Sequence, residues 1–569
     1  MFATLLKSLW RSAPSPDSLL QSARRLREQG RWQDALAAYQ QLCLADAAPA
    51  EAVREAAQLA LEQKQNDLAV VFLKQAIVHA PDDFSLQTNL AVLLKAAGDV
   101  AGALAAGTAA MGLAPGRVEP MYNLALLRDE LGEHEEAEKL HRAAIAATPD
   151  FEQAHNSLIC LLDQSPLAPA GAALEARRHW AQAYPLPAVP RRHRNPRDAE
   201  KVLNIGYVSA DFRGHSSAYF LEALFAKHDP GRVKIHCYYN WPAADAVSRR
   251  LQSLVPVWKD ISSMDDKQAA AAIEADGIDI LVDLSGHTVG NRLGVFAQQV
   301  APVQATYMGY LGSTGLPQIG YRISDAMLDP PGMTETVQTE TLVRTSASCV
   351  CFAPEPSAPP PNRLPALTNG ALTLTFGSLN ARRKLNAAVF ALWRRILLEV
   401  AGSRLIMVLE HGEQPAVCGP LLAFFAEGGV APGRVSIRGR QSLAGFFSCL
   451  QECDLLLDPF PCTGGTTTFH SLWMGVPVIT LAGDNALGRC GAMIMQSAGL
   501  PEFIAHSADE YVNIASRCAG DLPALAQVRA GLRDKFLAAP FADPARVARE
   551  LEDIYQGLWR DWCHAATPD

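Results

Sequence analysis

Residues 458–470, DPFPCTGGTTTFH, offer the clearest chemistry in this sequence. An apolar strand is expected to end at the Gly464-Gly465 turn, so that Thr466 and Thr467 stand where the next helix begins. Free amides and hydroxyls at such a helix start point at one spot, and the helix dipole favours an anion there. A diphosphate is the natural occupant. The alternative is that the threonines only cap the helix.

A cationic segment follows the first predicted strand of the same region. Residues 377–384, GSLNARRK, place Arg382, Arg383 and Lys384 at the same sheet edge as the threonines. One cation paired with a phosphate is worth roughly 1.5–3 kcal/mol, although a solvated basic loop is the alternative. The glycine turn is not a Walker motif, because no Lys follows it, and neither half of the region opens with a G-x-G-x-x-G turn.

Two histidine-bearing turns lie upstream. The predicted strand 203–209 runs into ADFRGHSS, which puts His215 at a strand-to-helix turn where a group that titrates near neutral pH is useful. The segment 283–288, DLSGHT, repeats the arrangement with His287, and 302–315 adds hydroxyls and glycines beside it. A single turn histidine is usually structural, but the coincidence of two favours a site.

The elements that must position these residues form two parallel α/β halves. Short β-branched runs alternate with helices, which is typical of doubly wound sheets. The predicted strands are 203–209, 233–239, 278–283, 303–308, 321–323, 372–376, 404–409, 435–438, 454–458 and 478–481, and helices are predicted at 386–400, 442–452 and 467–474. We expect a Rossmann-like lobe at 202–352, a Pro-rich linker at 353–370 and a second Rossmann-like, nucleotide-sugar-binding lobe at 371–560. Ligands should bind in the cleft between the carboxyl ends of the two sheets.

The first part of the chain carries a 34-residue repeat. Alanines recur at 35, 69, 103 and 137, glycines at 30, 98 and 132 with Lys64 in the missing slot, and prolines at 81, 115 and 149. Small residues let two helices approach closely, Gly permits the turn between them, and Pro ends the unit. The pattern resembles the tetratricopeptide repeat. We therefore expect an all-α tetratricopeptide superhelix with a capping helix at 17–185 and a linker at 186–201. Such solenoids hold proteins or peptides along a groove.

Composition narrows the class of protein. The chain has 569 residues, of which 49% are hydrophobic and 19% charged, and a net charge of −9, which argues against a general nucleic-acid binder. The basic run at 191–194 is expected to be a solvated linker. The 12 cysteines contain no C-x-x-C pair, so neither a disulfide framework nor a zinc site is predicted, and a cytoplasmic location fits. Residues 1–10 are too short an apolar stretch for a signal peptide, and no run of 18 apolar residues predicts a membrane span.

Together these motifs resemble a known family. A tetratricopeptide solenoid followed by VSADFRGH, DLSGHT, APVQATYMGYLGS, NARRK and CTGGTTT is similar to the nucleocytoplasmic O-linked N-acetylglucosamine transferases of glycosyltransferase family 41, which include the plant SPINDLY-type O-fucosyltransferases. The match is close to bacterial members, which lack a long insertion between the lobes. The resemblance implies a GT-B fold and an inverting, metal-independent transfer of a sugar, most simply N-acetylglucosamine from UDP-N-acetylglucosamine, to Ser/Thr of proteins.

The resemblance also implies roles for particular residues. His215 matches the family histidine proposed as general base or donor-binding group, and Lys384 matches the lysine on the donor β-phosphate. Thr466 and Thr467, after Gly465, match the helix start that binds the diphosphate.

Four further positions concern the binding of the nucleotide. Gln441 and Phe446 fall where the family contacts uracil and ribose, and Phe446 replaces a stacking His of the animal enzymes. His470 stands where those enzymes carry a carboxylate for the ribose, and Ala381 where they have a Gln. These departures leave the sugar preference and the strength of nucleotide binding less fixed than the fold.

Two other classes of function stay open. The same frame could transfer fucose from a GDP-sugar or epimerise a sugar nucleotide, and the chain could be a non-catalytic tetratricopeptide adaptor. A small-molecule epimerase has no use for a groove that holds proteins, and the retention of Lys384 with the threonine turn argues against an adaptor. The sequence has no D-x-D triplet, so we expect no metal or other cofactor, and protein cations must stabilise the leaving diphosphate. The expected partners are a UDP-sugar and protein acceptors, with no nucleic acid and no membrane.

Overall fold

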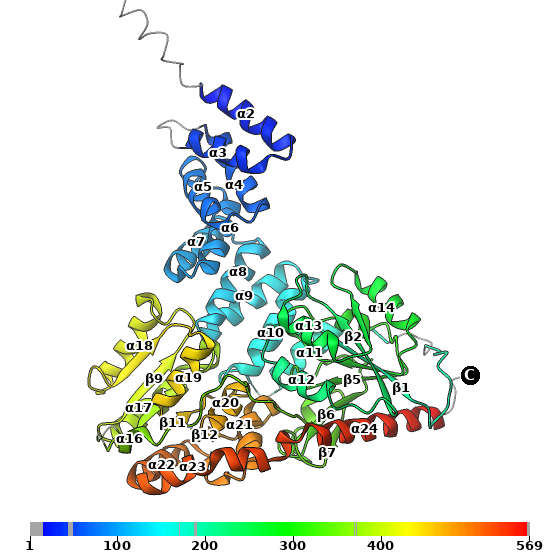
Figure 1. Cartoon of the computed structure of the whole chain (residues 1–569). Coiled ribbons are helices and arrows are strands. Elements are labelled where there is room, and N and C mark those ends of the chain that lie inside the picture. The colour runs from blue at the N-terminus through cyan, green and yellow to red at the C-terminus, as the bar shows by residue number, and fades with distance from the viewer. Residues whose placement is uncertain are drawn as a thin grey trace, which may run out of the picture. The chain divides into compact units, whose positions relative to one another are not determined.

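A computed structural model describes residues 15–43, 49–169, 171–186, 191–368, 370 and 372–565 of the chain (Figure 1). The chain forms two compact units, one of Met1–Arg128 with Lys139–Pro149 and one of Asp129–Glu138 with Asp150–Asp569. Several positions used in the sequence predictions lie outside the described residues, namely 1–10, 44–48 and 170 of the expected solenoid with its capping helix, 187–190 of the expected linker, 369 in the expected Pro-rich linker, and 371, the expected first residue of the second lobe.

The first unit is built of paired helices, as predicted. The helices of the repeats are α2 Pro16–Glu28, α3 Trp32–Cys43, α4 Ala50–Glu62, α5 Asn66–His79, α6 Phe84–Ala96, α7 Val100–Leu113, α8 Val118–Glu130 and α9 His134–Ala147. The alanines at 35, 69, 103 and 137 are all fully buried. Gly30, Gly98 and Gly132 have φ of 72°, 83° and 69°, and Lys64, which fills the missing slot, has φ of 55°. The periodic positions therefore do what the repeat requires, since small residues are buried and turn residues are left-handed.

The second unit begins within the repeats. It takes in residues 129–138, which are the end of α8, the turn after it and the start of α9, and then α10 Glu152–Gln164 and α11 Ala172–Ala181. The predicted capping helix at 170–184 corresponds to α11, which is shorter than expected.

Seven parallel strands form the first sheet, in the order β3-β2-β1-β4-β5-β6-β7. Their bounds are β1 Leu203–Ser209, β2 Val233–Tyr239, β3 Val257–Asp260, β4 Ile280–Asp283, β5 Val303–Tyr307, β6 Tyr321–Asp325 and β7 Thr341–Thr345. Central strands such as β1 are buried on both faces, as a parallel sheet between helices requires. The sequence analysis missed β3 and β7, because both are short edge strands with partly exposed side chains.

The second sheet has six parallel strands in the order β10-β9-β8-β11-β12-β13. They are β8 Thr375–Ser378, β9 Arg404–Val408, β10 Val435–Arg438, β11 Leu455–Leu457, β12 Val478–Leu481 and β13 Ile504–Ala505. The predicted helices appear as α17 Ala387–Glu399, α19 Leu443–Glu452 and α20 Thr466–Trp473, and those that were not predicted include α18 Pro415–Glu427, α21 Ala486–Ser497, α22 Ala508–Gly520 and α23 Leu522–Ala538. Two Rossmann-like lobes thus follow the helical repeats, as the sequence predicts.

The last helix, α24 Pro544–His564, lies along the first lobe although it follows the second (Figure 1). The Tyr555 hydroxyl is 2.8 Å from that of Tyr207 on β1, and the Trp559 indole donates to the carbonyl of Asp198. These contacts tie the end of the chain to the start of the first sheet. In the described residues, no helix is both long and apolar enough to cross a membrane.

Candidate active site

The threonine turn connects β11 to α20. The residue before the helix is Gly465, and among the described residues no side chain caps the helix start. Thr466 and Thr467 are half-buried inside the first turn rather than at the capping position, and the Thr467 hydroxyl lies 3.5 Å from the carbonyl oxygen of Leu379. The first amides of α20 are therefore left without a side-chain acceptor, which is the arrangement that suits an anion.

A buried carboxylate fixes the shape of this turn. Asp458, 1% exposed, accepts hydrogen bonds from the Gly464 amide at 2.7 Å and from the Thr480 hydroxyl at 2.9 Å. A Cβ on Gly464 would lie 2.7 Å from the same carboxylate, so only glycine fits there. Burial raises the pKa of Asp458 to about 6, against the opposing effect of these hydrogen bonds and of the Lys384 charge. The sequence analysis gave Asp458 no role, although an Asp directly after an apolar strand was a usable signal.

Lys384 meets the threonine turn from the neighbouring strand. Strand β8 leads into a short 3₁₀ turn, η2 Arg382–Lys384, and the Lys384 ammonium donates to the carbonyl oxygen of Thr463 at 2.7 Å. The structure thus brings this cation and the open start of α20 to one place at the carboxyl edge of the second sheet.

The three residues expected at the nucleoside lie along α19 and α20. The side-chain amide of Gln441, just before α19, donates to the Gly439 carbonyl at 2.7 Å. The ring centroids of Phe446 and His470 are 5.9 Å apart, and Tyr219 of the first lobe meets His470 edge-on at 4.8 Å. His470 is 4% exposed, and burial lowers its pKa to about 4. A neutral, buried ring of this kind is a poor substitute for a carboxylate that binds a ribose.

His215 lies in the turn between β1 and α12 Ala218–Phe225. Its side chain is 37% exposed, and its Nδ1 is 3.0 Å from the Ser217 hydroxyl and 3.5 Å from the Asp211 carboxylate. Burial lowers the pKa of His215; Asp211 opposes the shift, and the charges of Arg213 and Arg383 add to it. Because Arg383 belongs to η2, the charge of the second lobe reaches the histidine of the first.

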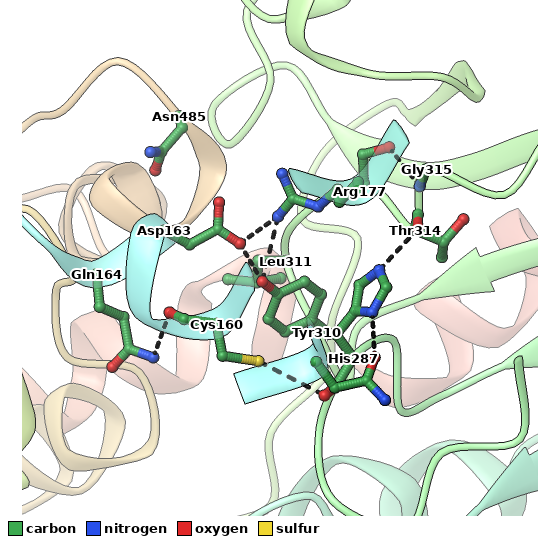
Figure 2. Close-up of polar contacts among 12 residues, drawn as sticks. Cys160, Asp163, Gln164, Arg177, His287, Tyr310, Leu311, Thr314, Gly315 and Asn485 are labelled. Atoms are coloured by element: carbon green, nitrogen blue, oxygen red, sulfur yellow. Dashed lines mark hydrogen bonds and ion pairs between the residues drawn. The ribbon is translucent and has the colours of Figure 1, made fainter. Parts of the chain in front are cut away.

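The second histidine turn serves a different purpose. His287 is 2% exposed, with Nε2 2.7 Å from the Thr314 carbonyl oxygen and Nδ1 2.6 Å from the Asn156 amide oxygen of α10 (Figure 2). A carbonyl can only accept, so Nε2 carries the proton. Burial lowers the pKa of His287 to about 3, so the ring is neutral and Nδ1 accepts, which requires the Asn156 amide to turn its nitrogen toward the ring. The interpretation of two matched histidines facing one cleft is therefore wrong for His287, which joins α10 to the first lobe.

The segment 302–315 likewise binds protein rather than facing a ligand. Figure 2 shows Tyr310 beside Asp163 of α10 and Arg177 of α11; both the tyrosine hydroxyl and the guanidinium donate to the Asp163 carboxylate. The Ser313 hydroxyl donates to Glu340 at 2.6 Å. Of these contacts, those of Tyr310, Asp163 and Arg177 fasten α10 and α11 to the first lobe, and the Ser313–Glu340 pair lies within that lobe.

The site that remains has donors for an anion and no group of metal ligands. Lys384, Gly465, Thr466 and Thr467 lie together, and the charge of Arg383, next to Lys384 in η2, helps to lower the pKa of His215 in the first lobe. Among the described residues, no three His, Cys, Asp or Glu side chains gather so that they could hold a metal ion.

Comparison with known proteins identifies the family to which this architecture belongs. The family model described as Glycosyl transferase family 41 matches residues 187–344 and 366–551, more than half of the chain. The chain belongs to glycosyltransferase family 41. A solved structure of a mutant O-GlcNAc transferase from Thermobaculum terrenum matches this family 41 chain with a TM-score of 0.82 and 31% identity, over 91% of this chain and 98% of the other. The predicted fold class, a helical repeat region followed by two α/β lobes, is thereby confirmed.

Two curated plant relatives of this family 41 chain are similar over the lobes. A Petunia hybrida protein named probable UDP-N-acetylglucosamine–peptide N-acetylglucosaminyltransferase SPINDLY is 38% identical over 379 residues, which is 66% of this chain and 40% of that protein. An Arabidopsis thaliana protein with the same name but the designation SEC is 29% identical over 382 residues, 65% of this chain and 38% of that protein. The match thus spans about two fifths of the length of these relatives.

Proposed function

We propose that this protein is an inverting, metal-independent glycosyltransferase that moves a sugar from a nucleoside diphosphate to Ser/Thr hydroxyls of proteins. The donor is UDP-N-acetylglucosamine, the nucleotide sugar in the names of the plant relatives. The observation that carries the proposal is the meeting of Lys384 with the open start of α20, 2.7 Å from ammonium to the Thr463 carbonyl. A cation beside free helix amides stabilises the charge that develops on a departing diphosphate.

The chemistry follows from this placement. The acceptor oxygen attacks the anomeric carbon from the side opposite the diphosphate, and the bond from that carbon to the β-phosphate oxygen breaks. The UDP departs with the electron pair toward Lys384, Thr466 and Thr467. The proton of the acceptor hydroxyl passes to His215, whose lowered pKa keeps the ring neutral at physiological pH. Gln441 and Phe446 flank the nucleoside.

The repeats are proposed to hold the protein acceptor. Stacked helix pairs present an extended surface that binds chains through many weak contacts. They contain none of the proposed donor-binding residues, so they should matter for long acceptors and not for the donor itself.

A panel of donors tests the proposal. Calorimetry with UDP and GDP, followed by transfer assays with UDP-N-acetylglucosamine and GDP-fucose on a protein and a short peptide, separates the candidate classes. Binding of UDP with transfer from its sugar supports the proposal. Transfer only from GDP-fucose would mean the O-fucosyltransferase alternative. A protein that binds none of these nucleotides would be a non-catalytic adaptor.

Replacing His215 with Ala should slow catalysis about 100-fold or more while changing UDP affinity little, because the group acts on the acceptor proton. In the parent enzyme, protonation of His215 removes the base. Because burial lowers the pKa of His215, kcat/KM should stay high through neutral pH and decrease only at pH values below the ordinary titration range of histidine. That decrease should vanish from the residual activity of the variant. Equal losses of rate and UDP affinity would make His215 a nucleotide ligand instead.

Transfer and donor hydrolysis should proceed unchanged in EDTA, since the diphosphate charge is met by Lys384 and the amides of α20. Initial rates with EDTA and with added Mg²⁺ or Mn²⁺ check this expectation. A strict requirement for either ion would show that the leaving-group account is wrong.

A further inference from the structure

The turn between α8 and α9 contacts the segment that carries Lys384. His134, 4% exposed, is the first residue of α9, directly after this turn, and its Nε2 is 2.7 Å from the carbonyl oxygen of Arg383. Because a carbonyl can only accept, the imidazole must donate this hydrogen bond. Both residues belong to the second compact unit. This unit contains the two lobes and also a ten-residue piece of the repeats, Asp129–Glu138.

Gly132 makes the fit close. It has φ of 69°, and a Cβ there would lie 2.6 Å from the Leu385 carbonyl oxygen and closer still to the Arg382 guanidinium. That guanidinium donates to the same Leu385 carbonyl and lies 5.2 Å from the centre of the Phe390 ring. The turn and the segment therefore meet with no space for even one methyl group.

The three residues of η2 have separate partners. The side chain of Arg382 lies against the repeat turn, the charge of Arg383 acts on His215, and Lys384 reaches the threonine turn. His134 holds the backbone between the second and third of these residues at the Arg383 carbonyl. A shift of that carbonyl must displace the peptide unit that it shares with Lys384.

We propose that His134 and Gly132 are positioning residues for Lys384, so that a turn of the helical repeats sets the place of the phosphate-binding cation. The inference rests on the proposed function of Lys384. Neither residue touches the donor; both act through η2. Since α8 and α9 run on from this turn into the first unit, the repeats are connected to the donor site by continuous helices.

Four single variants test the inference, with kcat, donor KM and UDP affinity measured for each. His134→Leu removes the donor to Arg383 and should lower kcat and UDP affinity roughly tenfold, the effect of one lost hydrogen bond in a preorganised site. His134→Gln, whose side-chain amide can reach the same carbonyl, should recover most of the loss. Gly132→Ala should be at least as damaging as His134→Leu.

Gly30→Ala is the matched control for Gly132→Ala. Gly30 occupies the same repeat position and has φ of 72°, yet a Cβ there would meet nothing within 4 Å. Both substitutions impose the same backbone strain, but only Gly132→Ala pushes against η2. Gly30→Ala should therefore leave kcat and UDP affinity unchanged, and this pair carries the test if His134→Leu does not fold.

A double variant shows whether the effect passes through Lys384. In a Lys384→Ala background, His134→Leu should change kcat by less than about twofold, since coupled residues are not additive. A full tenfold further loss there, or parent-like kcat and UDP affinity in His134→Leu and Gly132→Ala, would overturn the inference and leave the proposed function standing. If the parent protein transferred no sugar but UDP affinity fell in the expected order, the proposed transfer would fail and the positioning of a phosphate-binding lysine would stand.

Discussion

Replacing Lys384 with Ala is expected to lower the rate of sugar transfer by about two orders of magnitude or more, because a preorganised charge is lost where the diphosphate leaves. The fold should persist, since Lys384 is only half-buried and its ammonium donates to the Thr463 carbonyl at 2.7 Å rather than to a buried carboxylate. Initial rates of transfer at saturating donor, beside a thermal melt, check both statements.

Lys535→Ala is the control for that variant. Lys535 on α23 also donates to a carbonyl oxygen, that of Gly499, at 2.7 Å. Its side chain is exposed and belongs to none of the proposed donor-binding residues, so its loss should leave the transfer rate unchanged. Near-parent activity in Lys384→Ala would remove the phosphate assignment and with it the leaving-group account.

Replacing Asp163 with Ala should lower the free energy of unfolding by about 3–5 kcal/mol, because it leaves the buried Arg177 guanidinium without its carboxylate. The side chains of Arg177 and Asp163 are only 4% and 8% exposed. Trp180 on the neighbouring turn of α11 is also buried, and its ring lies 4.8 Å from His287, so its fluorescence during chemical denaturation reports on this region.

Two further variants serve as controls for Asp163→Ala. Glu222→Ala breaks a pair with Arg250 whose side chains are 30% and 58% exposed, and it should cost less than about 1 kcal/mol. Adding Arg177→Met to Asp163→Ala removes both buried charges and should recover much of the loss. A loss below about 1 kcal/mol in Asp163→Ala would show that this cluster does not hold α10 and α11 to the first lobe.

The sequence predicted those parts of the structure that depend on local pattern. The 34-residue repeat predicted that its alanines would be buried and that its turn residues would have positive φ. This holds even at Lys64, because the helix pair imposes the left-handed conformation on whichever residue occupies the turn position. The same holds for the central strands and for α20, where an apolar run, two glycines and the threonines mark the boundary within one or two residues.

What the sequence could not show depends on partners far along the chain. His287 and Tyr310 stand in turns that look like a site, yet their partners, Asn156 and Asp163, lie more than 130 residues away on α10. Nothing local marks that pairing. The fit of Gly132 against the Leu385 carbonyl is of the same kind, since the repeat alone already requires glycine at that position.

The division of the repeats at the turn after α8 has a consequence for how such a chain can be rebuilt. Whole 34-residue repeats that precede Val118 lie in the first unit. They can be added, removed or exchanged without altering a contact inside the unit that contains the sheets. The repeat that contains His134 cannot be exchanged in this way, and neither can α10 and α11 after it. Their side chains contact residues of the lobes. A chimaera that receives foreign repeats should therefore be joined before Val118. Under the proposed function, its range of protein acceptors would then change while its donor chemistry stayed that of the recipient.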